Sequence, residues 1–210
     1  SGVFAPLFSA DPRPSPLLAE RFSLFTSALL FALDSSPLEK NLTCMGVRGI
    51  RRQDPFPSAR VAIVDYHLAM FPRLPFSDGE RIPHVLTTGP GLPTTSETIL
   101  LHPGSGSQKK NWPIARFVEL AQRRAADGES VAWIMGPAEE GIVLPPGAQV
   151  WRGASLSALA STMARSRIYV GNDSGITHLS AASGCPTVAL FGASDPVVWA
   201  PRGRAVKIIS

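Results

Sequence analysis

Cysteine and long apolar runs are both scarce in this sequence. The 210 residues contain two cysteines, Cys44 and Cys185, which stand in regions that we interpret as separate domains. A disulfide framework is therefore not expected, and a reducing compartment fits. The longest apolar run, Ala28 to Leu33, is far below the roughly 20 residues that cross a bilayer. Nothing resembles a signal peptide. We expect a cytoplasmic protein for which any membrane contact is peripheral.

Signals for nucleic-acid and metal binding are also missing from the sequence. The chain has no Cys and His pairs at zinc-finger spacing and no interleaved aromatic and basic residues of the kind that bind RNA. Its formal charge of +4 comes from lysines and arginines that are spread along the chain rather than gathered in one block. This modest excess suits an anionic small molecule or a phospholipid surface. We expect no nucleic-acid partner, no metal and no other cofactor.

The second half of the chain alternates short apolar runs with helical patterns. The composition, 44% hydrophobic and 17% charged, allows a substantial core. Strands are predicted at 98–102, 130–135, 149–151, 168–170 and 187–191, and helices at 113–126, 156–165 and directly after 174. This alternation predicts an α/β fold with a right-handed parallel sheet of the Rossmann type. Ligands of such sheets bind beyond the carboxyl ends of the strands.

The first half of the chain is richer in loops. The patterns predict helices at 17–24, 37–45 and 59–71, and strands at 28–33 and 47–50. Residues 87–97, rich in Gly, Pro and Thr, are predicted to link two domains. We therefore divide the chain into residues 1–90 and residues 91–210.

The stretch from Gly171 to Gly192, GNDSGITHLSAASGCPTVALFG, follows an apolar strand and leads directly into a helix. Ser174 can cap that helix, and Ile176 and Leu179 stand on its apolar face. A strand, a tight glycine turn and a helix N-terminus together expose unpaired amides, which is an anion-binding arrangement. The alternative is that Asp173 is an ordinary turn or capping residue.

The loop from Gly104 to Pro113, GSGSQKKNWP, also joins a strand to a helix. Its glycines allow close approach to a ligand, its serines and amides can bind phosphate oxygens, and Lys110 can neutralise charge. The spacing matches neither the ATPase phosphate loop nor the dinucleotide fingerprint. The alternative is a solvated turn with two surface lysines. Two anion loops at one sheet edge nevertheless indicate a phosphorylated ligand.

Three further residues have open roles. Glu139 or Glu140 in GPAEEG can accept hydrogen bonds from a ribose or can simply begin a helix. His178 is either a packing residue or part of a site.

Two segments together resemble a known family. LLHPGSGSQKKNWPIARFVELA and the later YVGNDSGITHLSAASGCPTVALFGASDPVVWAPRG closely resemble the C-terminal nucleotide-sugar domain of family 9 glycosyltransferases, the ADP-heptose:lipopolysaccharide heptosyltransferases. The resemblance is dense over residues 99–203 and faint over the first 90. It implies a GT-B fold of two Rossmann-like domains with parallel sheets, the second holding the donor and the first facing the acceptor. Family members transfer heptose from ADP-heptose to the lipopolysaccharide inner core with inversion, generally without a metal.

The resemblance also assigns roles to residues. As catalytic candidates, Lys110 would neutralise the diphosphate and touch the sugar, and Asp173 would hold heptose hydroxyls or orient Lys110. Glu139 or Glu140 would meet the ribose, and His178 would support the turn or the diphosphate. The amides of Ser174, Gly175 and Ile176 would bind the phosphates, with Ser105, Gly106 and Ser107 as secondary candidates.

One feature of the family is missing from this sequence. Family members ordinarily begin with a strand and a G-D-x-L-L-x-x-P-like turn that carries the acidic residue proposed as the base, and these 210 residues contain no such segment. We expect the chain to start inside an incomplete N-terminal domain. It is then either a piece of a longer enzyme or a degenerate homologue that binds a nucleotide sugar without turnover. Another sugar donor or an epimerase-type activity stays open.

Overall fold

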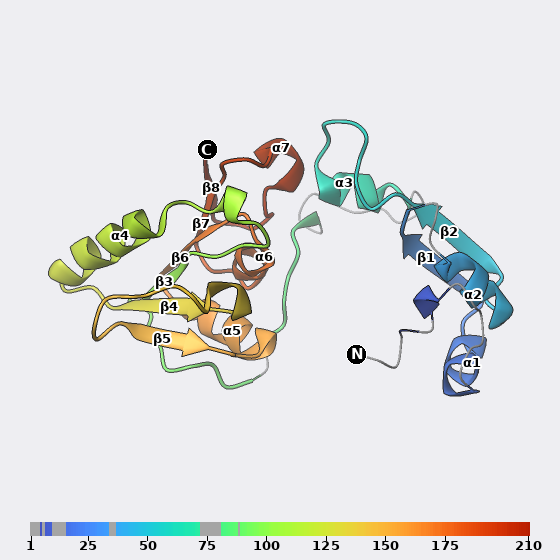
Figure 1. Ribbon diagram of the computed structural model, residues 1–210, viewed down its shortest axis with the longest axis horizontal. Coiled ribbons are helices and arrows are strands. Elements are labelled where there is room, and N and C mark those ends of the chain that lie inside the picture. The colour runs from blue at the N-terminus through green and yellow to red at the C-terminus, as the bar shows by residue number, and fades with distance from the viewer. Residues whose placement is uncertain (1–4, 6, 10–15, 34–36, 72–80, 88) are drawn as a thin grey trace. The chain divides into compact units, whose positions relative to one another are not determined.

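The computed structural model of the protein describes residues 5, 7–9, 16–33, 37–71, 81–87 and 89–210. The chain divides into two compact units, Ser1–Pro72 and Arg73–Ser210 (Figure 1). This division falls earlier in the chain than the boundary at 90–91 that the Gly, Pro and Thr content had suggested.

The first unit pairs two strands over a small core. Its elements are α1 (Pro16–Ser23), β1 (Ser27–Phe31), α2 (Leu38–Cys44), β2 (Gly49–Gln53) and α3 (Ile63–Leu68), and β1 pairs with β2 in parallel. The core contains Leu7, Leu18, Leu30, Leu42, Met45 and Val47.

Two elements of the first unit differ from the prediction. The strand expected at 47–50 begins at Gly49, because the amide of Val47 bonds back to the Leu42 carbonyl and its side chain is buried in the core. The helix expected at 59–71 covers only Ile63–Leu68. Its cap, Ala62, has extended backbone dihedral angles, so the helix cannot begin before Ile63. The apolar pattern therefore predicted too long a helix.

The second unit is a six-stranded parallel sheet in the order β5-β4-β3-β6-β7-β8. Its strands are β3 (Ile99–His102), β4 (Val131–Met135), β5 (Gln149–Arg152), β6 (Ile168–Asn172), β7 (Thr187–Leu190) and β8 (Val206–Ile209). Its helices are α4 (Ile114–Ala126), α5 (Leu156–Met163), α6 (Gly175–Ala182) and α7 (Pro196–Trp199), with 3-10 turns at Gln108–Lys110 and Pro137–Glu139. The predicted parallel sheet is confirmed.

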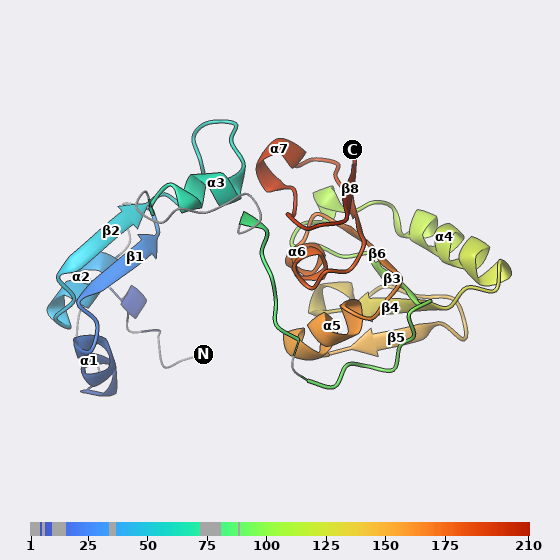
Figure 2. The same cartoon turned by 180° about the vertical axis from the view of Figure 1, so that it is seen from behind.

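Helices cover both faces of this sheet. Because side chains alternate along a strand, Leu100 of β3 packs with α5 residues on one face, while Ile99 and Leu101 pack with Phe117 of α4 on the other. The views in Figures 1 and 2 show α4 on one side of the sheet and α5 and α6 on the other. Because both faces of the sheet are buried, its strands have continuous apolar sequences rather than alternating ones.

The strand order creates a topological switch point between β3 and β6. The chain runs outward from β3 through β4 to β5, then returns to build β6 on the other side of β3. Connections leave the two neighbouring strands in opposite directions, so a crevice opens at their carboxyl ends. The two anion loops of the sequence follow these two strands.

The segment expected to link two domains lies along the second unit. Within residues 87–97, the Leu92 amide donates to Thr162 Oγ1 at 2.8 Å, and just before them the Val85 amide donates to the Ala182 carbonyl at 2.9 Å. These bonds satisfy backbone donors that no local secondary structure uses. Composition alone suggested a linker because it does not report hydrogen bonds to the distant helices α5 and α6.

Candidate functional site

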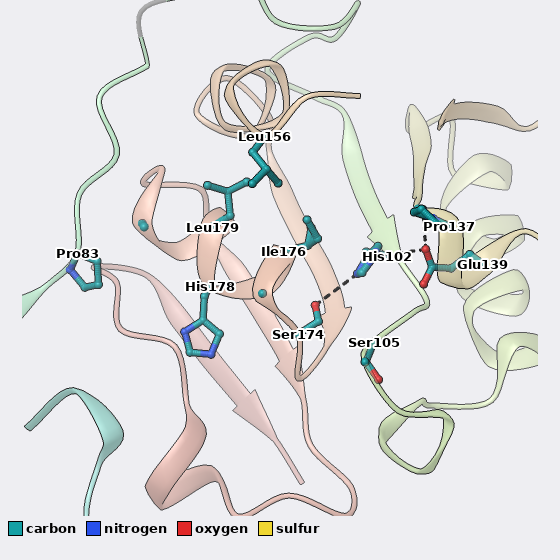
Figure 3. A pocket seen from close by; sticks show the side chains of 14 residues that line it. Pro83, His102, Ser105, Pro137, Glu139, Leu156, Ser174, Ile176, His178 and Leu179 are labelled. Carbon is teal, nitrogen blue, oxygen red and sulfur yellow. Dashed lines mark hydrogen bonds and ion pairs between the residues drawn. The ribbon is translucent and has the colours of Figure 1, made fainter. Parts of the chain in front are cut away.

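A cavity of about 640 Å³ opens at the carboxyl ends of β3, β4 and β6, within the second unit (Figure 3). Polar and apolar side chains both line it. The polar ones are His102, Ser105, Glu139, Ser174 and His178, and the apolar ones include Pro83, Pro137, Leu156, Ile176, Leu179 and Ala182. Such a wall suits a ligand with both an apolar ring and charged groups.

An ion pair joins the two anion loops. Lys110 Nζ lies 2.8 Å from Asp173 Oδ2, and the Ser194 hydroxyl donates to the same oxygen at 2.7 Å. The Asp173 side chain is 7% exposed, whereas that of Lys110 is 36% exposed. The carboxylate therefore fixes the direction of the lysine, whose charge stays accessible to a ligand.

Asn172, which sequence reasoning overlooked, holds the first loop against the second. Its side-chain oxygen accepts from the Trp112 amide at 2.9 Å, and its Nδ2 donates to the Pro103 carbonyl at 2.7 Å. The residue is fully buried. These two bonds fasten both ends of the loop that carries Lys110. The local signal was its place beside Asp173 at the end of a buried strand.

The N-terminus of α6 faces the same region. Ser174 is the N-cap, and its hydroxyl accepts from the Thr177 amide at 3.3 Å, as predicted for a capping serine. The amides of Gly175 and Ile176 precede the first turn of helical hydrogen bonds, so they have no acceptor within the helix. Both residues line the cavity. They could donate to an anion there.

The serines of the first loop differ in position. Ser105 lines the cavity, but its hydroxyl lies 2.6 Å from Asn111 Oδ1 and 2.8 Å from the Ser107 carbonyl oxygen, so the loop itself uses it. Gly106 also lines the cavity. Ser107 is the cap of the 3-10 turn and is not among the lining residues.

The structure separates the two glutamates that the sequence could not distinguish. Glu139 is buried and lines the cavity, whereas Glu140 is exposed and does not. The Glu139 carboxylate accepts from the Gly136 amide at 2.5 Å. It also occupies the space where a side chain at Gly104 would stand. Glycine at position 104 thus permits the close approach of the β4 turn to the first loop.

Two histidines line the cavity, and only one of them was considered in the sequence. His102, the last residue of β3, is 5% exposed, and burial lowers its pKa to about 4. Burial also lowers the pKa of His178, although Asp173 and a hydrogen bond to the Trp199 carbonyl oppose that shift. Both rings are therefore neutral near pH 7. The signal for His102 was its place at a strand end, directly before the glycine loop.

Within the described part of the chain, no group of three or more His, Cys, Asp or Glu side chains is arranged to hold a metal ion. None of the described helices is long and apolar enough to cross a bilayer.

Residues 59–210 match the family model described as glycosyltransferase family 9 (heptosyltransferase). The chain belongs to this family. Among curated proteins, lipopolysaccharide heptosyltransferase 1 of Pseudomonas aeruginosa is 36% identical over 122 residues, which is 55% of this chain and 33% of that protein. The chain spans between 33% and 43% of the length of the curated relatives that it matches.

Solved structures of the family share the fold. A family 9 glycosyl transferase from Veillonella parvula matches with a TM-score of 0.73 at 20% identity, over 92% of this chain and 65% of that one. ADP-heptose lipopolysaccharide heptosyltransferase II of Escherichia coli matches with a TM-score of 0.63 at 19% identity, over 92% of this chain and 71% of that one. These neighbours are GT-B glycosyltransferases, so the predicted fold class is confirmed.

Proposed function

We propose that this family 9 protein is a glycosyltransferase that moves a heptose, or a similar sugar, from an ADP-sugar to an anionic glycolipid of the lipopolysaccharide inner-core type. The observation that carries the proposal is the ion pair between Lys110 and Asp173 at the β3 and β6 switch point. The pair itself is not among the lining residues, but Asp173 directly precedes Ser174, Gly175 and Ile176, which line the cavity. The names of the relatives support the choice of donor and acceptor.

The proposed chemistry needs positive charge beside the leaving group. Breaking the bond between sugar and diphosphate develops negative charge on the departing ADP. Lys110 and the amides of Gly175 and Ile176 are placed to stabilise this charge, and loss of one such donor costs about 10²-fold to 10³-fold in rate. Asp173 keeps the lysine in place and has a second oxygen to offer to sugar hydroxyls.

The remaining parts of the cavity fit a nucleoside. The Glu139 carboxylate accepts one hydrogen bond from Gly136, which leaves lone pairs for ribose hydroxyls. Leu156, Ile176 and Leu179 present an apolar surface on which an adenine ring can pack. His178 stands near Asp173 and Lys110 and supports the diphosphate end.

The proposed acceptor places the protein at a membrane surface. A lipid-linked saccharide is met at the cytoplasmic face of the inner membrane, where a formal charge of +4 favours weak peripheral contact with anionic lipids. The acceptor side is assigned to the N-terminal part, residues 1–90. An inverting transfer also requires a base for the acceptor hydroxyl, and we assign that role to none of the described residues.

The test is calorimetry with ADP on the 210-residue chain. ADP is expected to bind in the micromolar range, and Lys110→Ala is expected to weaken binding by about 10-fold to 100-fold, because a charge-assisted contact is lost and Asp173 is left unpaired. The matched control is Lys109→Ala, which removes a neighbouring exposed lysine and should leave the Kd within about twofold.

Two results would contradict the proposal. If the wild-type chain binds no nucleotide, the proposal is wrong. If Lys110→Ala and Lys109→Ala weaken ADP binding equally, Lys110 has no special role in that binding. Binding of ADP-sugar without transfer to a lipid-linked acceptor would instead favour a nucleotide-sugar binding module.

A further inference from the structure

His102 stands between two polar groups on opposite walls of the cavity. Its Nε2 lies 3.9 Å from Glu139 Oε2, and its Nδ1 lies 3.5 Å from the Ser174 hydroxyl oxygen. Figure 3 shows the ring pointing between these two side chains. The three residues come from the ends of β3, β4 and β6, so His102 bridges the ribose side and the phosphate side of the proposed donor site.

The surroundings of the ring favour one tautomer. A carboxylate facing Nε2 attracts a proton there and repels a lone pair. The Nδ1 atom is then an acceptor for the Ser174 hydroxyl, which can also donate to Thr177 Oγ1 at 3.1 Å because the Thr177 hydroxyl donates to the Asn172 carbonyl. This direction suits Ser174, because its oxygen must keep a lone pair for the Thr177 amide that it caps. Burial keeps the pKa of the ring at about 4, so it stays in this neutral form near pH 7.

We propose that His102 is a positioning residue for donor binding, which directs the Glu139 carboxylate toward the ribose hydroxyls while Ser174 holds the other side of the ring. The inference rests on the proposed function and extends it to a residue that contacts neither the sugar nor the phosphates. Both contacts are longer than an ordinary hydrogen bond. Hydrogen bonds of this kind often tighten when the ligand binds.

Packing by itself does not account for this residue. The ring stacks on Tyr169 with centroids 6.5 Å apart, a contact that phenylalanine could also make. What only histidine supplies at this position is a donor toward Glu139 and an acceptor toward Ser174 on one rigid ring. The Ser174 hydroxyl is also held by Thr177, whereas Glu139 has few other restraints. The Glu139 carboxylate has one hydrogen bond, from Gly136, and without His102 it could rotate away from the ribose.

The test compares ADP with 2′,3′-dideoxy-ADP by calorimetry, because the ratio of their Kd values reports the ribose contact alone. The ratio is expected to be about 10 in the wild-type chain, the size of a hydrogen bond to a charged group. His102→Gln places its amide near the position of Nε2 and should keep the ratio. His102→Asn reaches only toward the Nδ1 side, and His102→Phe keeps the stacking alone, so both should lower the ratio toward 1.

These outcomes separate the inference from the proposed function. A wild-type chain that binds no ADP overturns both. A wild-type chain that binds both nucleotides equally, or an Asn variant that keeps the ratio, overturns the role of His102 and leaves ADP binding intact. A variant that folds poorly would have a lower melting temperature. Poor folding would not change the ratio of the two Kd values, because both nucleotides are bound by the same folded protein.

A second measurement needs no substitution at His102. Nitrogen-15 spectra of the wild-type chain distinguish the two neutral tautomers of each ring, and substitutions at the exposed His84 and at His67 assist the assignment among the 4 histidines. The inference requires a proton on Nε2 of His102 both without ligand and with ADP. A proton on Nδ1 would overturn it, even if every His102 variant failed to fold.

Discussion

The two units use the same strand pairing but differ in what covers it. In the first unit, β1 and β2 form a two-stranded parallel pair, and Leu29 and Phe31 of β1 remain 39% and 44% exposed. In the second unit, six parallel strands have helices on both faces, and Leu100 and Leu101 of β3 are fully buried. Parallel sheets depend on cover on both faces. The second unit therefore has the rigid core that can hold a site in place.

The difference also explains where the site lies. A crevice at strand ends requires neighbouring strands whose connections leave in opposite directions. The order β5-β4-β3-β6-β7-β8 provides such a pair at β3 and β6, whereas the described part of the first unit has one pair, β1 and β2, connected in sequence. The proposed donor binding is accordingly assigned to the second unit, and the following predictions test this difference between the two units.

The largest expected effect concerns the core of the second unit. Phe117→Ala removes a fully buried ring under α4 and should lower the free energy of unfolding by about 4 kcal/mol, because a cavity is left behind. The matched change in the first unit is Phe25→Ala at a ring that is 56% exposed, with an expected loss below about 1 kcal/mol. Urea unfolding measures both. Similar losses would show that the two units do not differ in packing as described.

The second prediction concerns pH and stability. The pKa of His102 is about 4 in the folded chain, against 6.5 for an ordinary histidine, because the ring is buried. Between these values the unfolded chain binds the proton and the folded chain does not, so stability present above pH 6.5 is lost as the pH falls toward 4. The loss is on the order of 3 kcal/mol.

Urea unfolding at a series of pH values measures this slope, and the control is His102→Gln, which cannot bind the proton. The variant should show a shallower decline over the same range. Carboxylates and His178 titrate in both proteins, so only the difference between the two curves reports His102. Parallel curves would contradict the burial of this ring.

The third prediction concerns the close approach at Gly104. In Gly104→Ala the new methyl group takes the space of the Glu139 carboxylate, which must leave its present position in the lining of the cavity. ADP affinity should fall by about tenfold, the size of a modest steric cost in a packed site. The matched control is Gly141→Ala, where a methyl group would meet open space and the Kd should not change. The Kd for ADP is measured by calorimetry. Equal values for the two variants would show that Glu139 does not contribute to nucleotide binding.

The smallest expected effect is on ADP binding after a change in the first unit. Leu18→Ala empties part of its core, since this side chain is fully buried there, and should lower the stability of that unit by about 2 to 5 kcal/mol. The Kd for ADP should nevertheless stay within about twofold of the wild-type value. A much larger change in the Kd, with the second unit still folded by circular dichroism, would show that the first unit takes part in donor binding.

Local patterns in the sequence were enough to predict the parallel sheet of the second unit and the edge at which its loops lie. Short apolar runs, separated by amphipathic helices, identify buried parallel strands without knowledge of their order. Ser174 was recognised as a helix cap because capping depends on residues within one turn. The resemblance named the family that the comparison later showed.

Tertiary structure decided the rest. The distinction between Glu139 and Glu140, the clamp by Asn172 and the place of His102 depend on contacts between residues far apart in the chain. Lys110 and Asp173, for example, are separated by 63 positions. They meet because β6 returns to pair with β3, a choice made by packing of the whole sheet rather than by any local pattern.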